Sequence, residues 1–96
     1  MLFLVTAEIR DAIVGEAVRR LRQDVGTAVE RVMGSGKVQA GGVVSGKRKL
    51  FFVLEADSAE ELQELLGSEL TDNANCDVLP ILPFESLQKF FMEHPV

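Results

Sequence analysis

Two carboxylates on apolar segments are the residues of this sequence best suited to acid–base chemistry. Glu8 ends the alternating N-terminal segment, and Glu55 lies near the end of the most apolar segment, Lys49–Ala56. A carboxylate works as a general base near neutral pH when burial in an apolar pocket raises its pKa. Glu55 is therefore the candidate catalytic base, with Lys49 as the cation that stabilises developing negative charge. The alternative interpretation makes Glu55 a structural carboxylate at the end of a strand.

Glu8 and Glu55 form a carboxylate pair only if their strands are neighbours and their ends coincide. Antiparallel strands would instead place the two side chains at opposite rims of a sheet. The basic run Lys47–Lys49 also has two interpretations. It could attract an anionic ligand to a pocket, but a solvated turn that discourages wrong strand pairing is the favoured interpretation.

Cys76 and His94 are each the single residue of their kind. A thiol nucleophile needs a lowered pKa and a nearby base, and His94 lies close to the C-terminal end. One cysteine and one histidine do not supply the ligand set of a zinc or haem site, and a GxGxxG segment followed by a helix is absent. We expect no metal and no cofactor.

Composition narrows the class of protein further. A chain of 96 residues predicts one domain, residues 1–96, and a hydrophobic fraction of 47% is ample for a globular core. The net charge of −5 disfavours a nucleic-acid partner. The apolar start, MLFLVTAEIRD, lacks a basic leader and is too short to span a bilayer, so no membrane role is expected. A single cysteine fits a cytoplasmic location.

The elements that would position these residues follow from hydrophobic spacing and turn signals. In the first half, the pattern predicts a strand over 1–8, a helix capped by Asp11 with a left-handed Gly34 at its end, and a strand over about 37–44 that leads into a Ser45-Gly46 turn. In the second half, it predicts a strand over Lys49–Ala56, a helix from Ser58 to Gly67, a loop over 68–75, a strand over Cys76–Leu82 and a helix over about 84–92. Consecutive glycines at 41 and 42 indicate a bulge or a close approach in the second strand. Pro80 indicates that the last strand is at an edge of the sheet or contains a bulge.

This order predicts a ferredoxin-like α+β fold, βαββαβ, with an antiparallel four-stranded sheet and an added C-terminal helix. Right-handed crossovers put both main helices on one sheet face, so the other face is bare and apolar. We predict a homodimer, a dimeric α+β barrel, in which two sheets meet and the C-terminal helix reaches over the partner or plugs one end. The predicted pocket residues are Leu4, Thr6, Glu8, Gln39, Phe51 and Val53.

Short segments across residues 1–82 carry a family resemblance. They are the opening Met1-Leu2-Phe3, Ser35-Gly36-Lys37 before the second strand, Asp57-Ser58-Ala59-Glu60-Glu61-Leu62 with the later Leu65-Leu66, and Asp77-Val78-Leu79-Pro80-Ile81. In these segments the chain resembles the muconolactone isomerases. The resemblance implies a dimeric α+β barrel with a small-molecule pocket, and it places Glu55 where that family has an acidic residue. The isomerases have a histidine after the opening, where this chain has Leu4.

Two functions follow as hypotheses. The first is a small-molecule-binding dimeric α+β barrel, isomerase-like if it is an enzyme, whose ligand is a lactone or a metabolite of aromatic degradation. The alternative is a non-catalytic accessory protein whose sheet face serves only oligomerisation, which the strand glycines and the lack of Tyr and Trp favour. A third interpretation, a cofactor-free monooxygenase of the same superfamily, rests on Thr6 and Gln39 alone.

Overall fold

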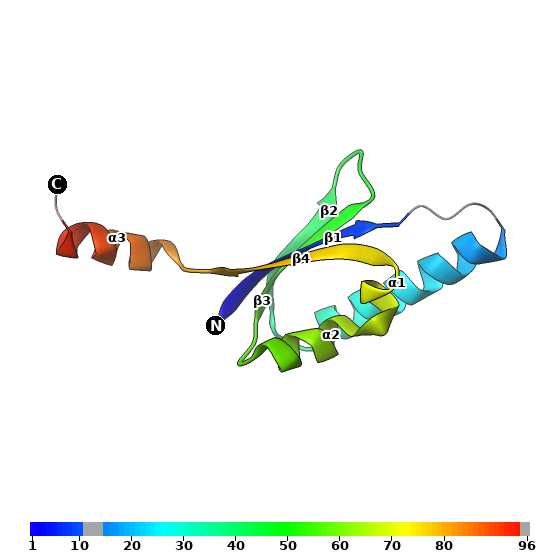
Figure 1. Cartoon of the computed structure of the whole chain (residues 1–96), viewed down its shortest axis with the longest axis horizontal. Helices are drawn as coiled ribbons and strands as arrows, with labels where there is room; N and C mark the ends of the chain where they lie inside the picture. The colour runs from blue at the N-terminus through cyan, green and yellow to red at the C-terminus, as the bar shows by residue number, and fades with distance from the viewer. Residues whose placement is uncertain (11–14, 95–96) are drawn as a thin grey trace.

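The structure, a computed structural model, is described for residues 1–10 and 15–94. Its elements, in chain order, are β1 (Leu2–Ile9), α1 (Glu16–Gly34), β2 (Val38–Val44), β3 (Lys49–Glu55), α2 (Ala59–Thr71), β4 (Ala74–Ile81) and α3 (Phe84–Glu93). The strands form one antiparallel sheet in the order β2-β3-β1-β4 (Figure 1). This is the predicted ferredoxin-like α+β fold.

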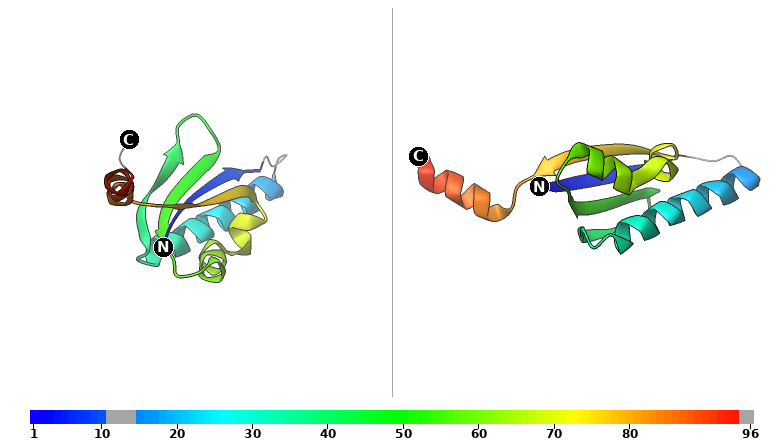
Figure 2. Two further views of the ribbon diagram at one scale, coloured as in Figure 1. Left: turned by 60° about the vertical axis from the view of Figure 1, so that its left-hand side comes forward. Right: turned by 90° about the horizontal axis from the view of Figure 1, so that it is seen from below.

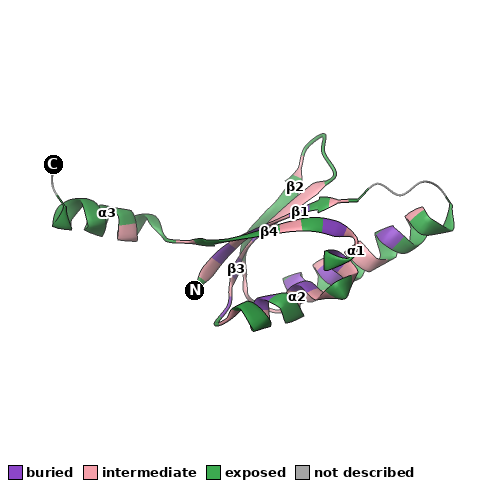
Figure 3. Cartoon of the chain, viewed as in Figure 1, coloured by how far each residue is buried: buried purple, intermediate pink, exposed green. Residues whose placement is uncertain are grey.

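The core lies between the sheet and the two helices α1 and α2, which cover the same sheet face (Figure 2). Phe3, Val5 and Ala7 alternate along β1 as its buried side chains. They pack with Phe52 and Leu54 of β3 and with the buried stripes of both helices. The buried positions therefore lie between the layers, and the opposite sheet face carries none of them. Figure 3 shows buried residues in both helices of the body and in the strands, but none in α3.

The sequence predicts the two ends of α1 from Asp11 as the N-terminal cap and from Gly34 as the left-handed residue at the C-terminal end. The predicted cap, Asp11, lies outside the described residues, and α1 begins at Glu16 after Gly15. The left-handed residue at the other end is Gly36, with a φ of 75°, so the prediction of Gly34 is wrong. Ser35 still has helical angles and donates its N–H to the Val32 carbonyl at 3.2 Å, which postpones the reversal of the chain.

The start of α2 confirms the predicted capping box. Ser58 Oγ accepts a hydrogen bond from the Glu61 N–H at 3.1 Å, and Glu61 Oε2 accepts one from the Asp57 N–H at 3.0 Å. The predicted stop at Gly67 is confirmed as a break, because the backbone leaves the helical conformation there, with a φ of 68° and a ψ of 167°; what the sequence does not predict is that a further helical turn follows, to Thr71. The predicted loop 68–75 therefore contains the last turn of α2 and the start of β4.

Arg31 of α1 explains why α2 can continue past this break. Its guanidinium donates to the carbonyls of Leu65 and Leu66, both at 3.1 Å, and so satisfies acceptors near the break. The same group binds the Glu69 carboxylate, with Nη2 and Oε2 2.9 Å apart. One arginine thus joins the two helices across the break. We call Arg31, Gly67 and Glu69 the helix clamp.

The two glycines of β2 make room for aromatic rings on opposite sheet faces. A Cβ atom added at Gly42 would lie 3.2 Å from the Phe51 ring, and one at Gly41 would lie 3.2 Å from the Phe52 ring. The strand also has a register shift between Val38 and Ala40. Of the two predicted alternatives, the close approach is found at the glycines, since a Cβ at Gly41 would also lie 3.1 Å from the Phe51 carbonyl oxygen, whereas the register shift precedes them.

The C-terminal helix α3 projects from the end of β4, away from the two layers (Figures 1 and 2). None of its residues is buried. Between β4 and α3 the chain is extended at Pro83, with a φ of −67° and a ψ of 161°. No helix in the described part of the chain combines the length and apolar character needed to cross a bilayer.

Candidate functional site

The sheet face that α1 and α2 leave open carries most of the predicted pocket residues. Leu4 lies opposite Val53, and Thr6 lies opposite Phe51, across the β1–β3 pair. Opposed residues share a face and approach each other closely, so these four side chains form one patch at the centre of the sheet. All four are half-buried. We call this surface the open face.

The register separates the two predicted carboxylates. Leu2 lies opposite Glu55, whereas Glu8 lies opposite Lys49. Six residues of strand span about 20 Å, so Glu8 and Glu55 do not form a pair within one chain. The same distance along β3 separates Glu55 from Lys49, so the predicted base and its predicted cationic partner lie at opposite ends of the open face.

Glu55 has a different partner in the structure. Its carboxylate forms an ion pair with the N-terminal ammonium of Met1, and its side chain is 45% exposed. This arrangement supports the structural interpretation of Glu55, because the carboxylate is held at the rim of the sheet and faces solvent. The apolar enclosure that the hypothesis of a catalytic base requires is not provided around Glu55 by a single copy of the chain.

Lys49 and Glu8 mark the polar end of the open face. The neighbouring strand β4 adds Asp77 opposite Thr6, and Asn75 opposite Glu8. Neither β4 residue was predicted as part of the site. The alternation along β4 could have placed Asp77 on the open face. Asn75 could not be placed on either face, because the polar segment before Cys76 was interpreted as a loop.

A cleft of about 330 Å³ adjoins this polar end and is lined by Glu8, Ile9, Lys47, Arg48 and Lys49. The Ile9 N–H donates to the Arg48 carbonyl at 2.7 Å, which fixes the turn between β2 and β3 against the end of β1. The basic run therefore lies at a turn, as favoured from the sequence, and it also lines a cleft. The three cations outnumber the single carboxylate there.

A second hollow, of about 340 Å³, lies on the helix-covered side of the same turn. It shares Ile9 and the basic run with the cleft, and its other lining residues are Leu21, Arg22, Val25, Gly26, Val43 and Leu50. The floor is apolar and comes from α1, β2 and β3. The turn between β2 and β3 thus places cations beside two apolar surfaces at one end of the sheet.

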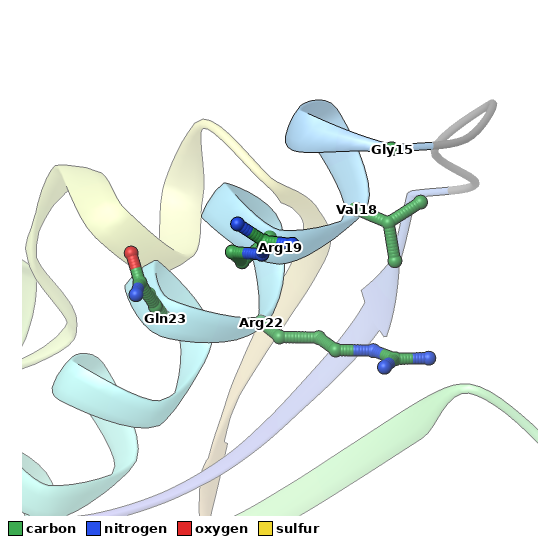
Figure 4. Close-up of a pocket in the computed structure, with 5 residues that line it drawn as sticks. All are labelled: Gly15, Val18, Arg19, Arg22 and Gln23. Carbon is green, nitrogen blue, oxygen red and sulfur yellow. The ribbon is translucent and has the colours of Figure 1, made fainter.

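A larger hollow, of about 530 Å³, runs along α1 (Figure 4). Gly15, Val18, Arg19, Arg22 and Gln23 line it, and all of them belong to α1 or precede it directly. Arg22 extends from the helix toward the sheet, while Arg19 binds Glu16 with 3.1 Å between nitrogen and oxygen. Because these residues come from one segment, this hollow lacks the converging groups of a built site.

Gln39 does not join the other predicted pocket residues. It lies at the register shift between Val38 and Ala40 and is exposed. The β2 residues that lie opposite Val53 and Phe51 are Ala40 and Gly42. The open face is therefore lined by small residues at its β2 side, where the sequence predicted an amide.

Cys76 and His94 serve no common site. Cys76 lies opposite Ala7, on the helix-covered face, and burial followed by the nearby Asp77 charge raises the pKa of its thiol. The His94 ring stacks on Phe90 at 4.5 Å, at the far end of α3. Over residues 1–10 and 15–94, no three His, Cys, Asp or Glu side chains gather closely enough to hold a metal ion.

Comparison with known proteins does not assign this chain to a family. No protein-family model matches the sequence, and a search of curated proteins finds no match.

Proposed function

We propose that this protein binds a small organic anion with an apolar body, in a space enclosed between the open faces of two copies. The observation that carries the proposal is the composition of the open face. Leu4, Phe51 and Val53 form its apolar centre, and Lys49 with Glu8 forms its polar end. A ligand pocket typically combines an apolar lining with a few placed polar groups.

The cleft at the polar end supports an anionic ligand. It holds three basic residues within a chain whose net charge is −5, so the local charge is opposite to that of the whole molecule. Positive charge concentrated at a cleft raises the local concentration of anions. Muconolactone, the compound that names the resembled family, has this chemistry, because it is a lactone ring with a carboxylate arm.

If the bound molecule is also turned over, the two carboxylates of the open face that the sequence singles out, Glu8 and Glu55, are the candidate bases. Glu55 is held by the Met1 ammonium, whereas Glu8 lines the cleft beside Lys49. The position of Glu8 supports it over Glu55 for a proton transfer at the anion-binding end. Following isomerisation of muconolactone by proton NMR in the Glu8→Gln and Glu55→Gln variants would separate the two, since full turnover in a variant excludes that residue as the base.

The binding proposal is tested by ligand-observed NMR on the full chain. The probes are muconolactone and its neutral ring, 2(5H)-furanone, which lacks the carboxylate arm. We expect Lys49→Ala to weaken muconolactone binding by about tenfold, which corresponds to about 1.4 kcal/mol, and to leave furanone binding unchanged. Lys89→Ala is the matched control, because it removes the same charge from an exposed position on α3.

Equal muconolactone binding by the wild type and the Lys49→Ala variant would overturn the assigned anion site. The alternative function, in which the open face serves only assembly, is supported by the engagement of Glu55 with Met1 and by its separation from Lys49. A stable dimer that binds neither probe at millimolar concentration would establish that alternative in place of ours.

A further inference from the structure

The C-terminal arm, residues 82–94, presents apolar side chains that its own chain does not cover. Leu82 is 81% exposed, Phe84 is 83% exposed and Phe91 is 60% exposed. The ring contacts of the arm are internal, since Phe90 packs on Phe91 with 6.1 Å between centroids and on His94. The arm therefore carries the kind of surface that soluble proteins place in an interface.

The arrangement of these residues on α3 is amphipathic. Phe84, Leu87, Phe90 and Phe91 fall within an arc of about 120° when each residue turns the helix by about 100°. Charged side chains, among them Lys89 and Glu93, occupy the opposite side. A recess of about 360 Å³ opens on the apolar side and is lined by Leu82, Pro83, Phe84, Ser86, Leu87 and Phe90. The recess could receive an apolar side chain from another molecule.

The overall shape shows that the arm extends beyond the body of the molecule. The radius of gyration is 16.0 Å and the principal extents are 58 × 27 × 17 Å. A compact chain of this length has a radius of gyration of about 12.5 Å. A helix of 10 residues is also marginal in water when nothing packs against it. The arm thus needs a surface that its own body does not supply.

We propose that the arm docks on the open face of a second copy of this chain, and that the exchange is reciprocal. The apolar surface is continuous from sheet to arm, because Leu79 and Ile81 lie on the open face of β4 directly before Leu82. Each copy therefore has both an apolar arm and an apolar face. Two copies related by a two-fold axis can bury both at once, as a self-complementary interface requires.

The area of the arms matches what a stable dimer needs. Phe84, Phe90 and Phe91 are 83%, 53% and 60% exposed. Since a Phe side chain can bury about 200 Å², these three leave about 400 Å² on each arm. If both arms are buried against partner surfaces of equal area, about 1,600 Å² of accessible surface is removed from solvent. This is the size of a standard protein–protein interface. This inference rests on the proposed function, because the arm would close an end of the space between the open faces.

The first test is the molar mass by light scattering during size exclusion. We expect the wild type to be a dimer, and we expect Phe91→Glu to weaken dimerisation by at least about 100-fold, because a buried aromatic side chain is lost twice in a two-fold interface. Lys89→Glu is the control. It changes the net charge by more than Phe91→Glu does, but it lies on the polar side of α3. Far-UV circular dichroism checks that the body of each variant stays folded. A monomeric wild type, or equal effects of the two substitutions, would overturn the proposal.

The second test distinguishes exchange from an arm that folds back on its own sheet. In a Cys76→Ser background, one protein carries Gln88→Cys on the arm, and two others carry Leu2→Cys or Asn75→Cys, one at each end of the open face. Oxidation of the arm protein mixed with one or the other of these two should give covalent heterodimers between arm and sheet. Failure to form them overturns the proposal, as does a chain with both cysteines that closes only within itself.

The outcomes also separate this inference from the ligand proposal. A dimer that keeps its affinity for muconolactone when Phe91 is replaced shows that the arm inference fails and ligand binding stands. A dimer that requires Phe91 but binds neither probe shows that the arm inference stands and the ligand proposal fails.

Discussion

Replacing Gly67 with alanine tests how α1 and α2 are held together. Gly67 has a φ of 68° and a ψ of 167°, which is a region of backbone conformation used almost only by glycine. A Cβ atom at this position would collide with the Arg31 guanidinium, whose Cζ would lie only 2.9 Å away. The variant must therefore strain the backbone and also displace the group that binds the carbonyls of Leu65 and Leu66.

The expected loss of stability follows from these two effects. Holding a non-glycine residue in this conformation costs about 1–3 kcal/mol. Losing the two hydrogen bonds to the carbonyls costs about 1 kcal/mol each. The free energy of unfolding should fall by about 3–5 kcal/mol in total, and the Tm by about 12–40 °C for a chain of this size.

Urea unfolding followed by far-UV circular dichroism is the appropriate assay, because the chain has no Trp or Tyr for fluorescence. Gly26→Ala is the matched control. It lies inside α1 with no atom within 4 Å of the added Cβ, so it should gain about 0.5–1 kcal/mol. Each variant is measured at several protein concentrations, since the proposed dimer would make the apparent stability depend on concentration.

Two results would refute this reasoning. If Gly67→Ala is as stable as the wild type, then neither the backbone strain nor the collision exists. If Gly67→Ala lowers the free energy of unfolding by the same amount in an Arg31→Ala background, where the collision is absent, then Arg31 plays no part in the clamp. Reduced cost in that background is the expected non-additivity of residues in contact.

Three further predictions concern the cap, the clamp and the thiol. Ser58→Ala should lower the free energy of unfolding by about 1 kcal/mol in the same urea assay, because it removes the side-chain cap of α2. The hydrogen bond from Arg31 holds the pKa of Glu69 below its ordinary value, so its stabilisation is complete at neutral pH and is lost as the pH falls through that lowered pKa. Glu69→Gln should accordingly be less stable than the wild type at pH 7, with a difference that shrinks in acid; a constant difference would contradict the pairing. Burial and then Asp77 raise the pKa of the Cys76 thiol, so iodoacetamide should alkylate it more slowly than free glutathione at pH 8, and Asp77→Asn should speed the reaction.

Much of the fold could be predicted from the sequence because its signals are local. The alternation of Phe3, Val5 and Ala7 along the first strand separates the two sheet faces without reference to any other element. The Ser58 capping box likewise depends on residues three apart. Such short-range patterns determine the type and order of the elements, and right-handed crossovers then leave few topologies.

The misses come from interactions between distant segments. Gly67 does break the helix, but the further turn to Thr71 was missed, because the guanidinium that binds carbonyls next to the break comes from Arg31, 36 positions earlier. The candidate site shows the same limit. Glu8 and Glu55 share one face, but the distance between them follows from the register between β1 and β3, which no single strand encodes. The separation of Lys49 from Glu55, by contrast, could be predicted from the six positions that separate them on one strand.

The two edges of the sheet determine what kind of assembly this chain can form. One edge strand, β2, has its register shift between Val38 and Ala40, and the other, β4, contains Pro80, which has no N–H to donate. Both features discourage the addition of further strands along the sheet. Growth by repeated edge pairing, the route to fibrils, is therefore opposed at both sides, whereas the proposed stacking through the open face would use up the available surface once two copies had met. The edges thus favour closed particles over filaments, and Pro80→Val, which restores an N–H donor to the edge strand β4, should be watched for filaments at high concentration.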